Sequence, residues 1–211
     1  MIRTNAPLGE PTLARLAGLL CLWAGLLGAA SGLVLAVVPP GVHASRYSYP
    51  LNAPAFAAVQ GWFFVQHLGL IAGLVGMRNA GAVGRRRLGF VVAMTAMGLL
   101  TIMELLAISA AWSVIPNRRT ELLDAGYGLA CAVSGIGLVV MGIEALRFGA
   151  WRGWRRCLPL ALGIYVFVPM FPAMFSGFVA ARLGITGWML SFAALGWALT
   201  RSSRDMASQP G

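Results

Sequence analysis

The sequence predicts an all-α integral membrane protein, a polytopic bundle of six transmembrane helices. Hydrophobic residues make up 59% of the 211 residues and charged residues only 10%, with a mean hydropathy of +0.79. Soluble domains usually carry about 25% charged residues. Long apolar stretches alternate with short arginine-bearing segments, and a helix needs about 20 apolar residues to cross a bilayer core of about 30 Å. These observations together favour a multi-pass membrane protein.

Each apolar stretch is expected to form one membrane-spanning helix, judged against the length of the bilayer core. The expected helices cover residues 13–38, 56–77, 88–115, 127–146, 157–180 and 184–200. They occupy most of the chain, so we expect one membrane domain covering residues 1–211. The first stretch precedes Val42-His43-Ala44, which resembles a signal-peptide cleavage site. Signal peptides have an apolar region of about 7–15 residues. Because the first stretch is longer than that, we expect it to be a retained helix. Removal of residues 1–44 would leave five helices.

The basic residues indicate topology. The net charge is +10, and all sixteen basic residues are arginine, a composition typical of high-GC bacterial genomes. In a six-helix arrangement twelve arginines fall on one side, and four fall on the other: Arg46, Arg118, Arg119 and Arg182. The positive-inside rule then predicts a bacterial plasma-membrane protein with both termini in the cytoplasm. We therefore expect the arginines to contact membrane lipid, with no nucleic-acid partner.

Two ionisable side chains fall near the middle of predicted spans. Glu104 has no arginine in its own helix, and an acidic residue at the centre of a membrane helix costs about 2.5–3.5 kcal/mol. It must therefore be protonated, face water, or meet a partner from another helix. His67 lies at a similar depth in the preceding helix and shares a face with Gln60. We expect a His67–Glu104 hydrogen bond, because helices joined by a short turn are usually neighbours.

The fifth stretch carries a second indication of a site. Pro169 and Pro172 lie in mid-span, and each removes a helix hydrogen bond. Backbone freed at that depth must be satisfied by neighbouring groups or line a cavity, and interrupted helices often mark transporter binding sites. Tyr165, Met170 and Met174 are expected to line such a cavity, although a simple proline kink would explain the pattern equally well.

Sequence motifs for cofactors and metals are absent. There is no phosphate-binding glycine loop, no His-Glu-x-x-His and no Gly-x-Ser-x-Gly, so we expect no cofactor and no metal site. The three cysteines lack disulfide-like spacing and are expected to be free thiols. Small residues recur at the four-residue spacing of helix contacts, as at Gly28 and Gly32, which suits compact packing and also homo-oligomers.

Several segments carry a resemblance to a known group of proteins. They are Tyr47-Ser-Tyr-Pro-Leu, the stretch from Gln60 through His67-Leu-Gly, Glu104-Leu-Leu-Ala-Ile-Ser, and Leu122-Leu-Asp-Ala-Gly-Tyr-Gly. In these the chain resembles small six-pass integral membrane proteins of high-GC bacteria. The resemblance covers most of the chain and implies the six-helix fold, but it implies no activity.

Three functions remain open on these residues. The leading hypothesis is a protein that binds or transports a small apolar or cationic solute, which enters beneath the Tyr47–Pro50 loop and reaches Glu104, His67 and the broken fifth helix. The first alternative is a membrane enzyme in which Glu104 is a general acid and His67 sets its protonation. The second is an accessory subunit in which Glu104 docks a partner helix. A transporter predicts a water-accessible route to Glu104, and an enzyme predicts a closed pocket. An accessory subunit predicts that Glu104 points out of the bundle.

Overall fold

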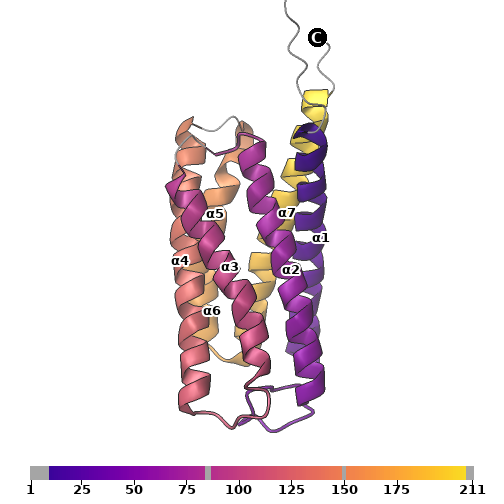
Figure 1. Cartoon of the computed structure of the whole chain (residues 1–211), viewed down its shortest axis with the longest axis vertical. Helices are drawn as coiled ribbons and strands as arrows, with labels where there is room; N and C mark the ends of the chain where they lie inside the picture. The colour runs from indigo at the N-terminus through magenta and orange to yellow at the C-terminus, as the bar shows by residue number, and fades with distance from the viewer. Residues whose placement is uncertain (1–9, 84–86, 149–150, 208–211) are drawn as a thin grey trace, which may run out of the picture.

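The computed structural model describes residues 10–83, 87–148 and 151–207, with side chains within these ranges from residue 13 to residue 201, and consists of helices joined by loops (Figure 1). Six helical segments are long and apolar enough to cross a membrane, and no strand occurs in the described ranges. The elements are α1 Glu10–Val37, α2 Ala53–Asn79, α3 Leu88–Ile108, α4 Arg118–Phe148, η1 Gly153–Cys157, α5 Leu158–Tyr165, η2 Val166–Met170, α6 Phe171–Phe175 and α7 Phe178–Ala207. The all-helical, six-span prediction is therefore confirmed.

The third and fourth helices differ from their predicted bounds. The third was expected to continue to residue 115, but α3 ends at Ile108, and Val114 instead forms an isolated antiparallel bridge with Arg46. The fourth was expected to begin at residue 127, but α4 begins at Arg118 because the Asn117 side chain accepts hydrogen bonds from two backbone amides of the first turn. Hydropathy reports contact with lipid, whereas helices begin and end where backbone groups find partners.

The fifth and sixth helices meet earlier than predicted. The fifth was expected to reach residue 180, but α6 ends at Phe175, and α7 begins at Phe178. Gly177 lies between them with φ +105°, a conformation that residues with a β-carbon rarely adopt. Within the fifth span, Val166–Met170 forms one π-helical turn around Pro169. The backbone is therefore locally altered at the predicted position, but the helix continues through it.

The helices form two groups, each packed closely within itself. In the first half, α1 packs on both α2 and α7; in the second half, α4 packs on both α3 and α5 (Figure 1). The halves meet where α2 contacts α3 and where α6 contacts α7. The first half therefore consists of α1, α2 and α7, and the second half of α3, α4, α5 and α6. We name the end formed by residues 38–52, 109–117 and 176–177 the loop end.

Glycine explains the tight packing inside each half. A β-carbon added at Gly25 of α1 would lie 2.5 Å from the Ala193 backbone nitrogen of α7, and one added at Gly137 of α4 would lie 2.5 Å from the Ala93 nitrogen of α3. Such close backbone approach maximises van der Waals contact between helices that gain no hydrophobic driving force in lipid. Between the halves, Gly184 of α7 also lies close to its neighbour, since an added β-carbon would be 2.9 Å from the Ala173 Cβ of α6.

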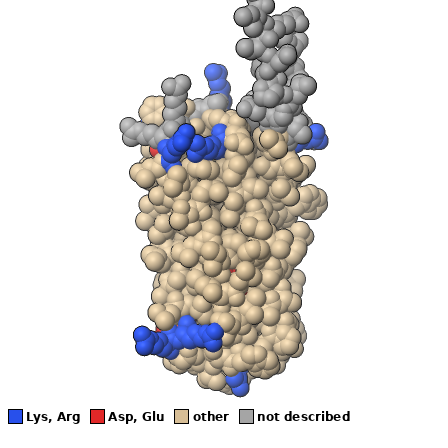
Figure 2. Space-filling model, viewed as in Figure 1, with Lys and Arg blue, Asp and Glu red and all other residues tan. Residues whose placement is uncertain are grey.

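The surface matches a membrane environment. Large apolar side chains such as Trp23, Val65 and Leu129 are exposed around the bundle. Arginine side chains gather at the two ends of the face seen in Figure 2, and few charged atoms are visible between them. Arg3, Arg85 and Arg86, which contributed to the topology prediction, lie outside the described residues.

Candidate functional site

A cavity of about 940 Å³ lies between the two halves. It runs from loop-end residues such as Arg46 and Tyr49 to His67 and Met189 within the bundle. His67 is fourteen residues beyond the start of α2, or about 21 Å along the helix at 1.5 Å per residue. Residues from α1, α2, α3, α4, η2, α6 and α7 line it, and most of its wall is apolar. The cavity therefore extends from one end of the bundle deep into the membrane-spanning region.

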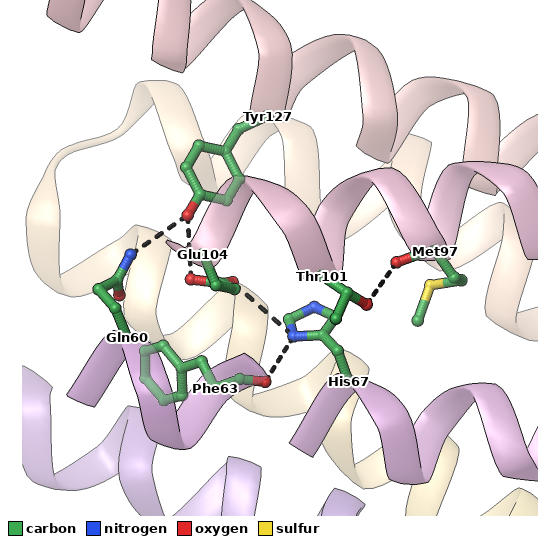
Figure 3. Close-up of polar contacts among 7 residues, drawn as sticks. All are labelled: Gln60, Phe63, His67, Met97, Thr101, Glu104 and Tyr127. Atoms are coloured by element: carbon green, nitrogen blue, oxygen red, sulfur yellow. Dashed lines mark hydrogen bonds and ion pairs between the residues drawn. The ribbon is translucent and has the colours of Figure 1, made fainter. Parts of the chain in front are cut away.

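Glu104 is the central polar residue of this cavity. Its side chain projects from α3 into the bundle and is only 7% exposed (Figure 3). The Tyr127 hydroxyl donates a hydrogen bond of 2.9 Å to Glu104 Oε2, and Gln60 Nε2 donates to that hydroxyl at 3.2 Å. An ionised carboxylate has about four acceptor positions. In the described part of the chain Tyr127 is its one donor of good geometry, and the Gln60 amide interacts with it as well, so it keeps acceptor capacity for another donor.

His67 lies beside Glu104 but is not hydrogen-bonded to it. The distance from His67 Nδ1 to Glu104 Oε1 is 3.8 Å, too long for a hydrogen bond, so the predicted bond is wrong while the predicted proximity is confirmed (Figure 3). The same nitrogen lies 2.9 Å from the Phe63 carbonyl oxygen one turn earlier in α2 and donates to it. The His67 N–H that we expected to donate to Glu104 thus donates to the α2 backbone instead. The Tyr127 hydroxyl takes its place as the donor to Glu104.

A second polar pair lies nearer the loop end. The Tyr47 hydroxyl donates to Asp124 Oδ1 at 3.2 Å, and both residues line the cavity. Burial, and then the adjacent Asp124 carboxylate, raises the pKa of the Tyr47 phenol above its ordinary value. This contact links the loop 38–52 to α4, so it closes part of the gap between the halves above the cavity.

Arg182 contributes a positive charge to the same cavity. It was expected in an external loop, but it lies in the second turn of α7 and lines the cavity. Its guanidinium lies 5.0 Å from the centre of the Phe178 ring, a cation–π contact. It also interacts electrostatically with Glu104 and Tyr127, although no ion pair joins it to Glu104. The cavity therefore carries a carboxyl group from one half and a guanidinium from the other.

The residues predicted to form the site divide into two groups. Glu104, His67 and Gln60 line the cavity, as do Met170 and Met174 from the fifth span. The others do not: the Tyr165 hydroxyl donates to the Gly184 carbonyl oxygen at 3.1 Å, and Pro169 and Pro172 are exposed on the bundle surface. The prolines alter the helix geometry that places Met170 and Met174, and they contribute no wall of their own.

Sequence reasoning missed Tyr127, Arg182 and Trp188. Tyr127 was assigned to the beginning of a helix, and Arg182 to a loop, because both were placed by hydropathy alone. Trp188 gave no signal, since a tryptophan in an apolar helix suits any membrane protein. Their shared feature, a polar atom on a helix face turned toward the other half, becomes visible only once the helices are paired.

Comparison with known proteins does not extend these conclusions. No protein-family model, no curated protein and no solved structure matches the chain. The described residues include no group of three histidine, cysteine, aspartate or glutamate side chains placed to hold a metal ion. The cavity and its polar side chains are therefore the features that bear on function.

Proposed function

We propose that this integral membrane protein binds a small, largely apolar solute through a nitrogen-bearing polar group held at Glu104. The observation that carries the proposal is a buried carboxyl group with unused acceptor capacity in a cavity of about 940 Å³. Small-molecule sites typically occupy about 300–1,000 Å³ and combine apolar walls with a few convergent polar groups. An amine or other cationic N–H donor is the chemistry that complements a carboxylate.

The walls suit such a solute. Phe63, Phe171 and Trp188 offer aromatic surface, which also attracts cations, and Met170 and Met174 offer flexible apolar surface. A solute entering from the loop end would pass the Tyr47–Asp124 pair before it reached Glu104. We propose that the loop end faces the outside of the bacterial plasma membrane. Transport would further require the halves to separate toward the other end.

Two other functions compete with binding. The enzyme hypothesis keeps Glu104 as a general acid, and it differs from the leading one by predicting a chemical change in the bound molecule. The accessory-subunit hypothesis required Glu104 to point out of the bundle toward a partner helix. Glu104 instead points into the cavity, so that hypothesis loses the observation on which it depended.

Thermal unfolding of the purified protein with lipophilic amines tests the proposal. A ligand that binds only the folded state at 100 times its Kd stabilises it by about 2.7 kcal/mol. We expect amines to raise the melting temperature of the wild type and not of Glu104→Gln, which keeps the side-chain size. Glu144→Gln is the matched control, because Glu144 is also buried, with 8% of its surface exposed, but lies outside this cavity. Equal shifts in all three proteins would exclude Glu104 as the binding group.

A further inference from the structure

The α7 side of the cavity presents donors without partners. Arg182 lies along its wall, and within the described chain its guanidinium makes the cation–π contact with Phe178 but no hydrogen bond or ion pair. A guanidinium has five N–H donors and cannot lose its charge under ordinary conditions. An arginine within a membrane helix usually pairs with another group or reaches the interface. Arg182 therefore has Glu104 as a distant counter-charge but keeps guanidinium donors free for a bound group.

Trp188 provides an independent sign of a missing acceptor. The residue lines the same cavity and is 3% exposed, and its indole Nε1 has no hydrogen-bond partner in the part of the chain that the structure describes. Buried polar atoms are nearly always paired, because leaving one unpaired costs about 1–3 kcal/mol of desolvation energy. The indole N–H can only donate. A bound hydrogen-bond acceptor that reaches this nitrogen would satisfy it.

We infer that the cavity takes an amphipathic zwitterion, whose acidic group faces Arg182 and Trp188 on α7 while its amine faces Glu104 on α3. The amine half of this inference rests on the proposed function, and the acidic half rests on Arg182 and Trp188. The two poles of the ligand match two protein poles of opposite sign on opposite halves of the bundle. Guanidinium groups favour carboxylates and phosphates, to which they donate two parallel hydrogen bonds. The apolar remainder of the ligand would lie along Met170 and Phe171.

Four probes with the same apolar chain separate the two poles. Octanol carries neither charge, octylamine carries the amine, octanoate carries the acid, and 2-aminooctanoate carries both. Their affinities are measured by calorimetric titration of the full-length protein in lipid nanodiscs. We expect 2-aminooctanoate to bind at least about tenfold more tightly than octylamine, the effect of one charge-assisted contact. In Arg182→Gln this advantage should vanish, whereas in Glu104→Gln the advantage of the amine should vanish.

Control variants keep the outcome interpretable. Arg118→Gln removes an exposed arginine at the start of α4 and should change none of the four affinities. Trp188→Phe keeps an aromatic ring but removes an N–H that has no partner among the described residues, so it should fold and weaken only the two acidic probes severalfold. It also provides a second test if Arg182→Gln does not fold.

The results distinguish failure of the inference from failure of the proposed function. If 2-aminooctanoate binds no better than octylamine, or keeps its advantage in both Arg182→Gln and Trp188→Phe, the acidic pole is wrong. Binding of octylamine that still depends on Glu104 would leave the proposed function standing. If Glu104→Gln changes no affinity while the acidic probes still depend on Arg182, the amine pole and the proposed function are wrong together.

Discussion

The close approach of α3 and α4 predicts that one added methyl group is costly at Gly137 and harmless at Gly128. Both glycines lie in α4, so they share a helix and a change to alanine alters helix propensity equally. An added β-carbon at Gly137 would lie 2.5 Å from the Ala93 nitrogen and 2.8 Å from its Cα, both backbone atoms. At Gly128 an added β-carbon would meet nothing within 4 Å. The pair therefore isolates helix packing from backbone entropy.

The magnitude follows from these distances. Ordinary van der Waals contact of a β-carbon begins at 3.4 Å, so Gly137→Ala must separate the two helices by about 0.9 Å. Overpacking of this kind costs about 1–3 kcal/mol, against a helix-propensity gain of about 0.8–1 kcal/mol for glycine to alanine. Because the obstructing atoms are backbone and cannot rotate away, we expect a net destabilisation of up to about 2 kcal/mol. Gly128→Ala should stabilise by up to about 1 kcal/mol.

Reversible unfolding in mixed micelles measures the difference. Titration with a denaturing detergent, followed by tryptophan fluorescence, gives the free energy of unfolding of each variant. The seven tryptophans are present in both variants, so the signal is shared. The wild type should lie between the two variants, which should differ by about 1–3 kcal/mol. If Gly137→Ala proves as stable as Gly128→Ala, the close packing of α3 on α4 is refuted.

Three further predictions concern the cavity. Tyr127→Phe removes the hydroxyl that contacts Glu104 and Gln60, and should lower the free energy of unfolding by about 1–3 kcal/mol. The loss should be smaller when Glu104 is already changed to Gln. If the losses from the two substitutions simply add, the contact is refuted. The Tyr47 phenol, whose pKa is raised, should contribute stability that is complete below the ordinary tyrosine pKa of about 10 and is lost as the pH rises through the folded-state pKa. An ultraviolet titration of wild type against Tyr47→Phe checks this, and a difference centred at the ordinary value would contradict it. Cys131 lines the cavity, so a small thiol reagent should modify it more slowly when octylamine is bound, as followed by intact-protein mass spectrometry; an unchanged rate would place octylamine elsewhere.

The sequence predicted the number and type of helices because lipid imposes a simple rule on length and hydropathy. It predicted their ends less well. The polar turn from Arg118 to Asp124 is helical because Asn117 caps it, not because it is apolar. The apolar run after Ile108 leaves the helix because Val114 pairs with Arg46, which is distant in sequence. Hydropathy contains neither kind of information.

The candidate site was predictable where it depended on neighbouring helices alone. Gln60, His67 and Glu104 lie together because α2 and α3 are consecutive and joined by a short connection. Tyr127 and Arg182 reach the same cavity through the pairing of α4 and α7 with other helices, which residue spacing along the chain does not reveal. The identity of the hydrogen-bond donor to Glu104 was therefore out of reach, although the burial of its carboxyl group was expected.

The position of the cavity follows from how the halves are built. Within each half, glycines such as Gly25 and Gly137 bring backbones into contact and leave no space for a ligand. Between the halves, beside the close approach of Gly184 to Ala173, longer polar side chains reach across. Gln60 of α2 donates to the Tyr127 hydroxyl of α4, and Arg182 of α7 interacts electrostatically with Glu104. A ligand held by both residues would join the halves by its own two poles. Ligand binding would then be coupled to the relative position of the halves. A ligand that lacks either pole should bind without drawing the two halves together.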